Sequence, residues 1–165
     1  AAVVGHDWGA AAAWTLAQKY PENVSRLAAL QIPPPQVLRK NLSVKQFLAS
    51  WYMFFFQLPY LPEFILRQND YAVLATSLET TTARKGVFSS EDIAEYKKAW
   101  SEPGALTAMV NYYRANVFRR LLKPQTQNGA PKITVPTLFI YGEKDFAVMP
   151  ETTRNIGEAI DAPFS

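Results

Sequence analysis

The chain has 165 residues, a length that fits one domain able to bury a sizeable hydrophobic core. Hydrophobic residues make up 48% and charged residues 19% of the sequence, which is typical of an ordinary soluble protein. The net charge is only +3 and the basic residues are scattered, so no nucleic-acid-binding surface is indicated. The lack of cysteine excludes disulfides and thiolate metal sites. Because no secretory signal or membrane span is seen, we expect a cytoplasmic protein, and the sequence does not indicate its oligomeric state.

The first predicted element is a strand that runs into a glycine-flanked turn. Residues 1–4 are apolar, GHDWG follows at 5–9, and the alanines after it favour a helix from about Gly9 to Tyr20, where Pro21 ends it. We expect glycine at both ends of the turn because a Cβ there would clash across it. This spacing is the nucleophile-elbow pattern, in which the central residue sits strained with its side chain exposed. Asp7 occupies that nucleophile position.

Two further apolar runs predict parallel strands. The run VSRLAALQI at 24–32 reads as a buried strand, and Pro33, Pro34 and Pro35 after it cannot continue a ladder or a helix. The run TLFIYG at 137–142 has the β-branched and aromatic residues of a core strand. We therefore predict an α/β fold, a partial α/β-hydrolase fold with parallel strands and flanking helices.

The hundred or so residues between the second and third strands predict helices, with bounds at 44–58, 62–78, 91–100 and 102–122. Ser90 is a candidate N-cap, and Pro62 and Pro103 fit first-turn positions. A helical insertion between two parallel strands is a cap, so we expect the cap at 36–128 and the core at 1–35 and 129–165. Most aromatic residues of SWYMFFFQLPY at 50–60 are expected to fill the cap.

A second polar signal follows the third strand, in YGEKDFAVMP at 141–150. Taken alone, Glu143 to Asp145 would read as a solvated turn. In the chain order nucleophile, acid and histidine, however, the acid follows a late strand at the carboxyl end of the sheet, and Asp145 stands there. The rival position after the second strand holds Ile32 and Pro33, which cannot serve as the acid.

Four segments carry a family resemblance: GHDWGA at 5–10, WYMFFFQLP at 51–59, NYYRAN at 111–116 and GEKDFAVMP at 142–150. Together they resemble soluble-type epoxide hydrolases of the α/β-hydrolase fold, and the resemblance covers essentially the whole chain. It implies that Asp7 is the nucleophile, Asp145 the orienting acid, and Tyr52 and Tyr113 the pair that grips the epoxide oxygen. Tyr112 is an alternative to Tyr113, because neighbours on a helix point about 100° apart. The remaining implied residues, for the oxyanion and for substrate binding, are Trp8, Trp51 and Phe146.

The implied reaction opens a small epoxide with water to a vicinal diol through an aspartyl ester, without a metal or organic cofactor. GHDWG is shared with haloalkane dehalogenases, in which Trp8 and either Trp51 or Trp100 would bind halide, so dehalogenation is the nearest alternative. A third alternative is a non-enzymatic scaffold or inactive homologue.

The ends of the chain indicate a fragment, because it begins inside a strand without an initiator Met and stops after a helix pattern. In the family order, an HG-x-P loop would precede Ala1 and the catalytic histidine would follow Ser165. His6, the one histidine in the sequence, is an elbow residue that we do not expect to be the general base. We therefore expect the isolated chain to be inactive.

Overall fold

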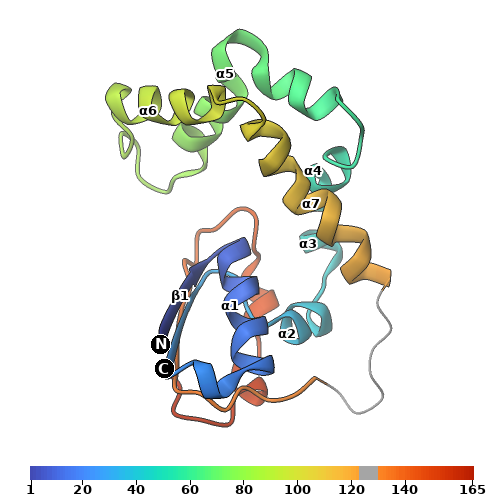
Figure 1. Ribbon diagram of the computed structural model, residues 1–165, viewed down its shortest axis with the longest axis vertical. Helices are drawn as coiled ribbons and strands as arrows, with labels where there is room; N and C mark the ends of the chain where they lie inside the picture. The colour runs from blue at the N-terminus through green and yellow to red at the C-terminus, as the bar shows by residue number, and fades with distance from the viewer. Residues whose placement is uncertain (123–129) are drawn as a thin grey trace. The chain divides into compact units, whose positions relative to one another are not determined.

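The computed structural model describes residues 1–122 and 130–165, shown in Figure 1. Contacts divide the chain into two compact units: unit 1 spans Ala1–Ala49 and Pro124–Ser165, and unit 2 spans Ser50–Lys123. Residues 36–49, which the sequence assigned to the cap, thus group with the strands. The predicted boundary at 128 lies outside the described residues.

Unit 1 is built on a parallel sheet, as predicted. Its strands are β1 (Ala2–His6), β2 (Arg26–Leu30) and β3 (Thr137–Ile140), in the order β1-β2-β3. The register places His6 opposite Leu30, and Leu30 opposite Ile140. The second and third strands are shorter than the predicted 24–32 and 137–142, and β2 ends where Gln31 adopts φ 70°, which a strand cannot accommodate.

The last residues of the chain extend this sheet beyond β3. The backbone N–H of Thr137 donates to the carbonyl of Pro163 at 2.9 Å, and the N–H of Phe139 donates to the carbonyl of Ser165 at 2.9 Å. The N–H of Ser165 donates back to the Thr137 carbonyl at 3.2 Å, and the bridge between Thr137 and Phe164 is parallel. Residues 163–165 therefore pair with the edge of β3 opposite β2, which the helix pattern in the sequence did not predict.

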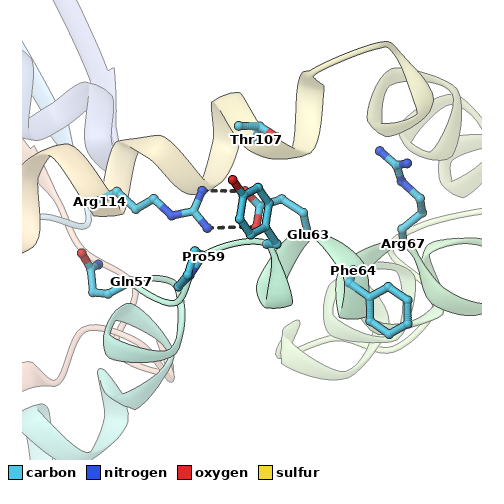
Figure 2. A pocket seen from close by; sticks show the side chains of 8 residues that line it. Gln57, Pro59, Glu63, Phe64, Arg67, Thr107 and Arg114 are labelled. Carbon is cyan, nitrogen blue, oxygen red and sulfur yellow. Dashed lines mark hydrogen bonds and ion pairs between the residues drawn. The ribbon is translucent and has the colours of Figure 1, made fainter.

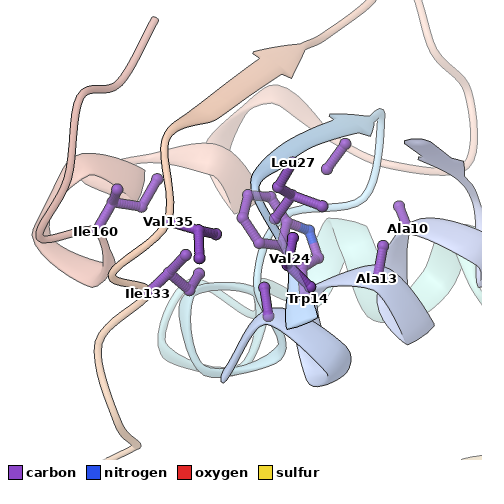
Figure 3. Close-up of a cluster of buried hydrophobic side chains, with 10 residues drawn as sticks. Ala10, Ala13, Trp14, Val24, Leu27, Ile133, Val135 and Ile160 are labelled. Carbon is purple, nitrogen blue, oxygen red and sulfur yellow. The ribbon is translucent and has the colours of Figure 1, made fainter. Parts of the chain in front are cut away.

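The core of unit 1 lies where α1 (Trp8–Lys19) packs on one face of the sheet (Figures 1 and 3). Trp14 is fully buried, and its indole Nε1–H donates to the Ile32 carbonyl at 2.8 Å. Alanines line the buried side of α1, so the helix can approach the strands closely. The buried cluster consists of Ala10, Ala13, Trp14, Ala17, Val24, Leu27, Ala29, Ile133, Val135 and Ile160.

The helices after β2 differ from the prediction. Pro34 and Pro35 do not exclude a helix but begin one, α2 (Pro35–Lys40), because a first-turn residue needs no N–H partner. The predicted helix at 44–58 is two helices, α3 (Val44–Ala49) and α4 (Trp51–Phe55). Ser50 separates them with φ −90° and ψ 12°, outside the α-helical range.

Unit 2 is helical, as predicted. Its helices are α4, α5 (Leu61–Thr81), α6 (Ser90–Ser101) and α7 (Ala105–Leu122). Its buried cluster consists of Leu66, Trp100, Leu106 and Val110. None of the helices in the described part of the chain is long and apolar enough to cross a membrane.

Three details of unit 2 differ from the predicted helices. Within α5, residues 69–71 have φ of 50°, 54° and 59°, so the helix is kinked there and continues beyond 78. The N-cap of α6 is Ser89 rather than Ser90, and Ser89 and Asp92 exchange hydrogen bonds in a capping box. Pro103 precedes α7, which begins at Ala105 rather than 102.

The corner between β1 and α1 is set by a close approach of backbone atoms. A Cβ at Gly5 would lie 2.7 Å from the backbone nitrogen of Ala10, a distance that real Cβ contacts essentially never show. A Cβ at Gly9 would meet nothing within 4 Å outside its own helix, so the expected clash at Gly9 was wrong. Only the first glycine of the turn is required by sterics.

We predict that Gly5→Ala lowers the free energy of unfolding by about 1–3 kcal/mol, because backbone must shift to admit the methyl group. Gly9→Ala is the matched control and should leave stability unchanged or raise it by up to about 1 kcal/mol through helix propensity. Urea denaturation of the native protein that carries residues 1–165 measures both changes. Equal effects of the two substitutions would contradict the steric account of the corner.

Candidate active site

Asp7 stands at the corner between β1 and α1. Its backbone has φ 51° and ψ −123°, a conformation that a non-glycine residue rarely adopts, and its side chain is exposed. The carbonyl of Asp7 accepts the N–H of Ala11 at 3.2 Å, so the first turn of the helix starts directly at this residue. Strain of this kind gathers at functional sites, and it presents the carboxylate outward from the end of the strand.

Asp145 lies in the loop after β3 and is held by backbone amides. Its Oδ1 accepts the N–H of Ala147 at 2.7 Å and the N–H of Val148 at 2.8 Å. Its own N–H donates to the carbonyl of Gly142 at 3.1 Å. The second carboxylate oxygen, Oδ2, accepts no hydrogen bond from any residue that the structure describes. The carboxylate is thus fixed in orientation with one oxygen available to a partner.

The two aspartates follow strands of the same parallel sheet, at the carboxyl ends of those strands. Asp7 directly follows β1, Asp145 follows β3 by five residues, and β2 lies between the two strands. At the end of β2, the side-chain Oε1 of Gln31 accepts the N–H of Gly142 at 2.9 Å, which joins the carboxyl ends of β2 and β3. Since neighbouring strands are about 4.8 Å apart, the ends of β1 and β3 are separated by about 10 Å.

The loop that carries Asp145 is anchored from α3 by Gln46, a residue that the sequence did not single out. The Gln46 side chain is buried, its Nε2 donates to the Ala147 carbonyl at 2.7 Å, and its Oε1 accepts the N–H of Met149 at 2.8 Å. The hydroxyl of Tyr141 adds a bond to the Val148 carbonyl at 2.9 Å. Burial raises the pKa of Tyr141, and the nearby charge of Asp145 adds to that rise, so the phenol stays protonated as a donor.

In unit 2, Tyr52 on α4 and Tyr113 on α7 lie together. Their ring centroids are 5.7 Å apart with the rings edge to face. Phe56 completes a three-ring cluster, at 5.8 Å from Tyr52 and 4.9 Å from Tyr113. The adjacent Tyr112 is 58% exposed. Of the two neighbouring tyrosines, Tyr113 is therefore the one that pairs with Tyr52.

The other residues implied by the resemblance are Trp8, Trp51 and Phe146, and they differ in burial. Trp8 is the first residue of α1 and is partly buried. Trp51 on α4 is 65% exposed with its ring 6.2 Å from that of Phe55, and Phe146, directly after Asp145, is 56% exposed. Their assignment to oxyanion and substrate binding stays a prediction. In the described ranges 1–122 and 130–165, no three His, Cys, Asp or Glu side chains gather as a metal site.

Unit 2 also has a hollow of about 610 Å³ on its surface, shown in Figure 2. An ion pair between Glu63 on α5 and Arg114 on α7 lies along it, with Nη1 to Oε1 at 2.5 Å and Nη2 to Oε2 at 2.9 Å. The hydrogen bond from Arg114 lowers the pKa of Glu63, and Glu63 in turn raises the pKa of Arg114, so both stay charged. The hollow is lined by Gln57, Pro59, Tyr60, Glu63, Phe64, Arg67, Thr107 and Arg114.

Comparison with known proteins identifies the fold family. The sequence profile of the alpha/beta hydrolase fold matches residues 1–163. An AB hydrolase superfamily protein, YfhM, of Bacillus subtilis is 44% identical over 147 residues, which are 88% of this chain and 49% of that protein. Human epoxide hydrolase 4 is 40% identical over 150 residues, which are 87% of this chain and 40% of that protein.

A solved structure agrees with the sequence relatives. The crystal structure of Bacillus megaterium epoxide hydrolase in complex with an inhibitor superimposes with a TM-score of 0.79 at 27% identity, covering 99% of this chain and 60% of that chain. The chain thus spans about half the length of the curated relatives it matches. Because the family profile matches nearly every residue of a chain that has the parallel sheet and the corner described above, the chain belongs to the α/β-hydrolase fold family.

Proposed function

We propose that this chain forms the nucleophile-bearing part of an epoxide hydrolase, which opens epoxides to vicinal diols through an ester on Asp7. The observation that carries the proposal is the pairing of Tyr52 with Tyr113, two phenols from different helices whose rings lie 5.7 Å apart. An aspartate at the strained corner, in place of the serine of acyl hydrolases, supports the same reaction. The epoxide hydrolases among its relatives agree with this proposal.

In the first step, a carboxylate oxygen of Asp7 attacks an epoxide carbon. The carbon–oxygen bond of the ring breaks as the ester bond forms, and the electron pair stays on the ring oxygen. An aspartate is ionised at neutral pH and needs no activation, whereas a serine hydroxyl would need a base first. The exposed side chain and the strained backbone of Asp7 suit this direct attack.

The tyrosine pair stabilises the charge that develops on the ring oxygen. Two phenols can donate hydrogen bonds to that oxygen, and one of them then transfers its proton to give the hydroxyl. The resulting phenolate regains a proton when ester hydrolysis releases one.

In the second step, water hydrolyses the ester at the Asp7 carboxyl carbon, releasing the diol and regenerating the carboxylate. The backbone N–H of Trp8 is proposed as an oxyanion donor. This step needs a general base, which Asp145 would orient through its available Oδ2. His6 lies on β1 immediately before the nucleophile and is unsuited to that part, so we propose that the base comes from outside residues 1–165 and that these residues alone do not turn over.

Replacing the nucleophile tests the ester mechanism. Asp7→Ala should abolish diol formation in the native protein that carries residues 1–165, and Asp7→Asn should nearly do so, because an amide does not attack the ring. In heavy-oxygen water, a single turnover of the unaltered protein should give a diol without label, since its new oxygen comes from Asp7. Mass spectrometry that finds label in this first diol would show direct attack by water.

Removing the phenols one at a time tests the tyrosine pair. Tyr52→Phe and Tyr113→Phe should each raise the activation free energy of ester formation by about 2 to 4 kcal/mol, because each removes one donor to the ring oxygen. Ester breakdown should be largely unaffected. The double variant should form the ester more slowly than either single variant. Tyr112→Phe is the matched control and should be silent. Stopped-flow kinetics under single-turnover conditions separate the two steps. Unchanged ester formation in the double variant would remove the main support for epoxide opening.

Substrate choice separates this function from dehalogenation, which uses the same nucleophile. We expect the native protein to consume styrene oxide-like epoxides and to release no halide from short haloalkanes, because its paired donors are phenols rather than indoles. Gas chromatography of the diol and a halide-selective electrode measure the two reactions. Halide release at a rate comparable to epoxide loss would reverse the assignment.

A further inference from the structure

Helix α4, which carries Tyr52, cannot hold its position by itself. It has only five residues, Trp51–Phe55, far fewer than an isolated helix needs to be stable in water. The segment that follows is tightly bent, with Tyr60 at φ 63° before α5 begins at Leu61. The place of Tyr52 therefore depends on what fixes the end of α4 to the rest of unit 2.

Arg114 supplies that connection. Its Nε–H donates to the carbonyl of Phe56 at 3.0 Å, and its Nη2 donates to the carbonyl of Leu58 at 2.7 Å. Phe56 is the C-cap of α4, and its N–H donates to the carbonyl of Tyr52 at 2.9 Å. The guanidinium thus satisfies carbonyls at the end of the helix that would otherwise lack partners, one helical turn after the tyrosine.

The same guanidinium is itself fixed by Glu63. The carboxylate uses both oxygens, and the two side chains are only 24% and 15% exposed, so the pair is more than a solvated surface contact. Glu63 stands in the first turn of α5, where a negative charge is favourable. Arg114 therefore joins three elements at one point: α7, the end of α4 and the start of α5.

We propose that Arg114 is a positioning residue for the tyrosine pair. It follows Tyr113 directly in α7, so one helix presents the second phenol and also holds the segment that places the first. The carbonyls of Phe56 and Leu58 and both carboxylate oxygens of Glu63 occupy the guanidinium, so it has no part in the chemistry itself. This inference rests on the proposed function, because the spacing of the phenols matters only if both act on the substrate oxygen.

The test compares two variants of the ion pair in the native protein that carries residues 1–165. Arg114→Lys keeps the positive charge, but an ammonium group cannot hold a carboxylate and a carbonyl in the fork geometry of a guanidinium. It should slow ester formation by about ten- to a hundredfold, the scale of a misplaced catalytic group, with ester breakdown almost unchanged. Glu63→Gln, which keeps the size of the side chain, should give a smaller effect of the same kind.

Lys97→Met is the matched control within unit 2. The variant removes another ion pair between helices, in which Lys97 Nζ lies 2.6 Å from Asp70 Oδ2. Neither residue belongs to the three-ring cluster of Tyr52, Phe56 and Tyr113. Ester formation should be unchanged in this variant, and thermal denaturation of all variants shows whether they fold. If Arg114→Lys fails to fold, Glu63→Gln carries the test, and normal ester formation in it overturns the proposal.

A double-mutant cycle distinguishes positioning from general structural support. In the Tyr52→Phe background, Arg114→Lys should slow ester formation by much less than it does in the unaltered protein, because the phenol it positions is already absent. Equal slowing in both backgrounds overturns the inference. If the tyrosine variants slow ester formation and Arg114→Lys does not, only the role of Arg114 fails; if the tyrosine variants are silent, the proposed function itself fails.

Discussion

The close approach of β1 and α1 at Gly5 is the constraint on which the candidate site depends. Because a Cβ at Gly5 would meet the backbone of Ala10, the strand can turn into the helix within a single residue only when that position is glycine. The residue at the apex is then forced into a strained conformation, and that residue is Asp7. The packing of Trp14 and the alanines of α1 on the sheet holds the corner in place and opposes relaxation of the strain.

Each unit also contains a short segment that is held by polar side chains from a distant part of the chain. The loop that carries Asp145 is short and irregular, and the buried Gln46 side chain fixes it through two backbone groups. The short helix that carries Tyr52 is held through its last carbonyls by Arg114. In each case the group expected to do chemistry stands on a short segment that hydrogen bonds from a distant side chain hold in place.

The features that the sequence predicted are local ones. The strands, the corner at Asp7 and the helical character of unit 2 follow from apolar runs, glycine spacing and proline positions, which act over a few residues. The features that it missed depend on partners far along the chain. Gln46 reads as an ordinary polar helix residue until its bonds to Ala147 and Met149, about a hundred positions later, are seen. The family resemblance brought Tyr52 and Tyr113 into consideration, and the contact between their rings is seen only in the structure.

The proposed reaction requires that Asp7 forms a covalent bond to the substrate. The most direct measurement is to mix the native protein that carries residues 1–165 with an epoxide, quench with acid within the first turnover, and map the peptides by mass spectrometry. We expect the peptide containing Asp7 to gain the full mass of the epoxide, and tandem fragmentation to assign the added mass to that carboxylate. Diol formation without any adduct in repeated early quenches, or an adduct on a different residue, would contradict the proposed reaction.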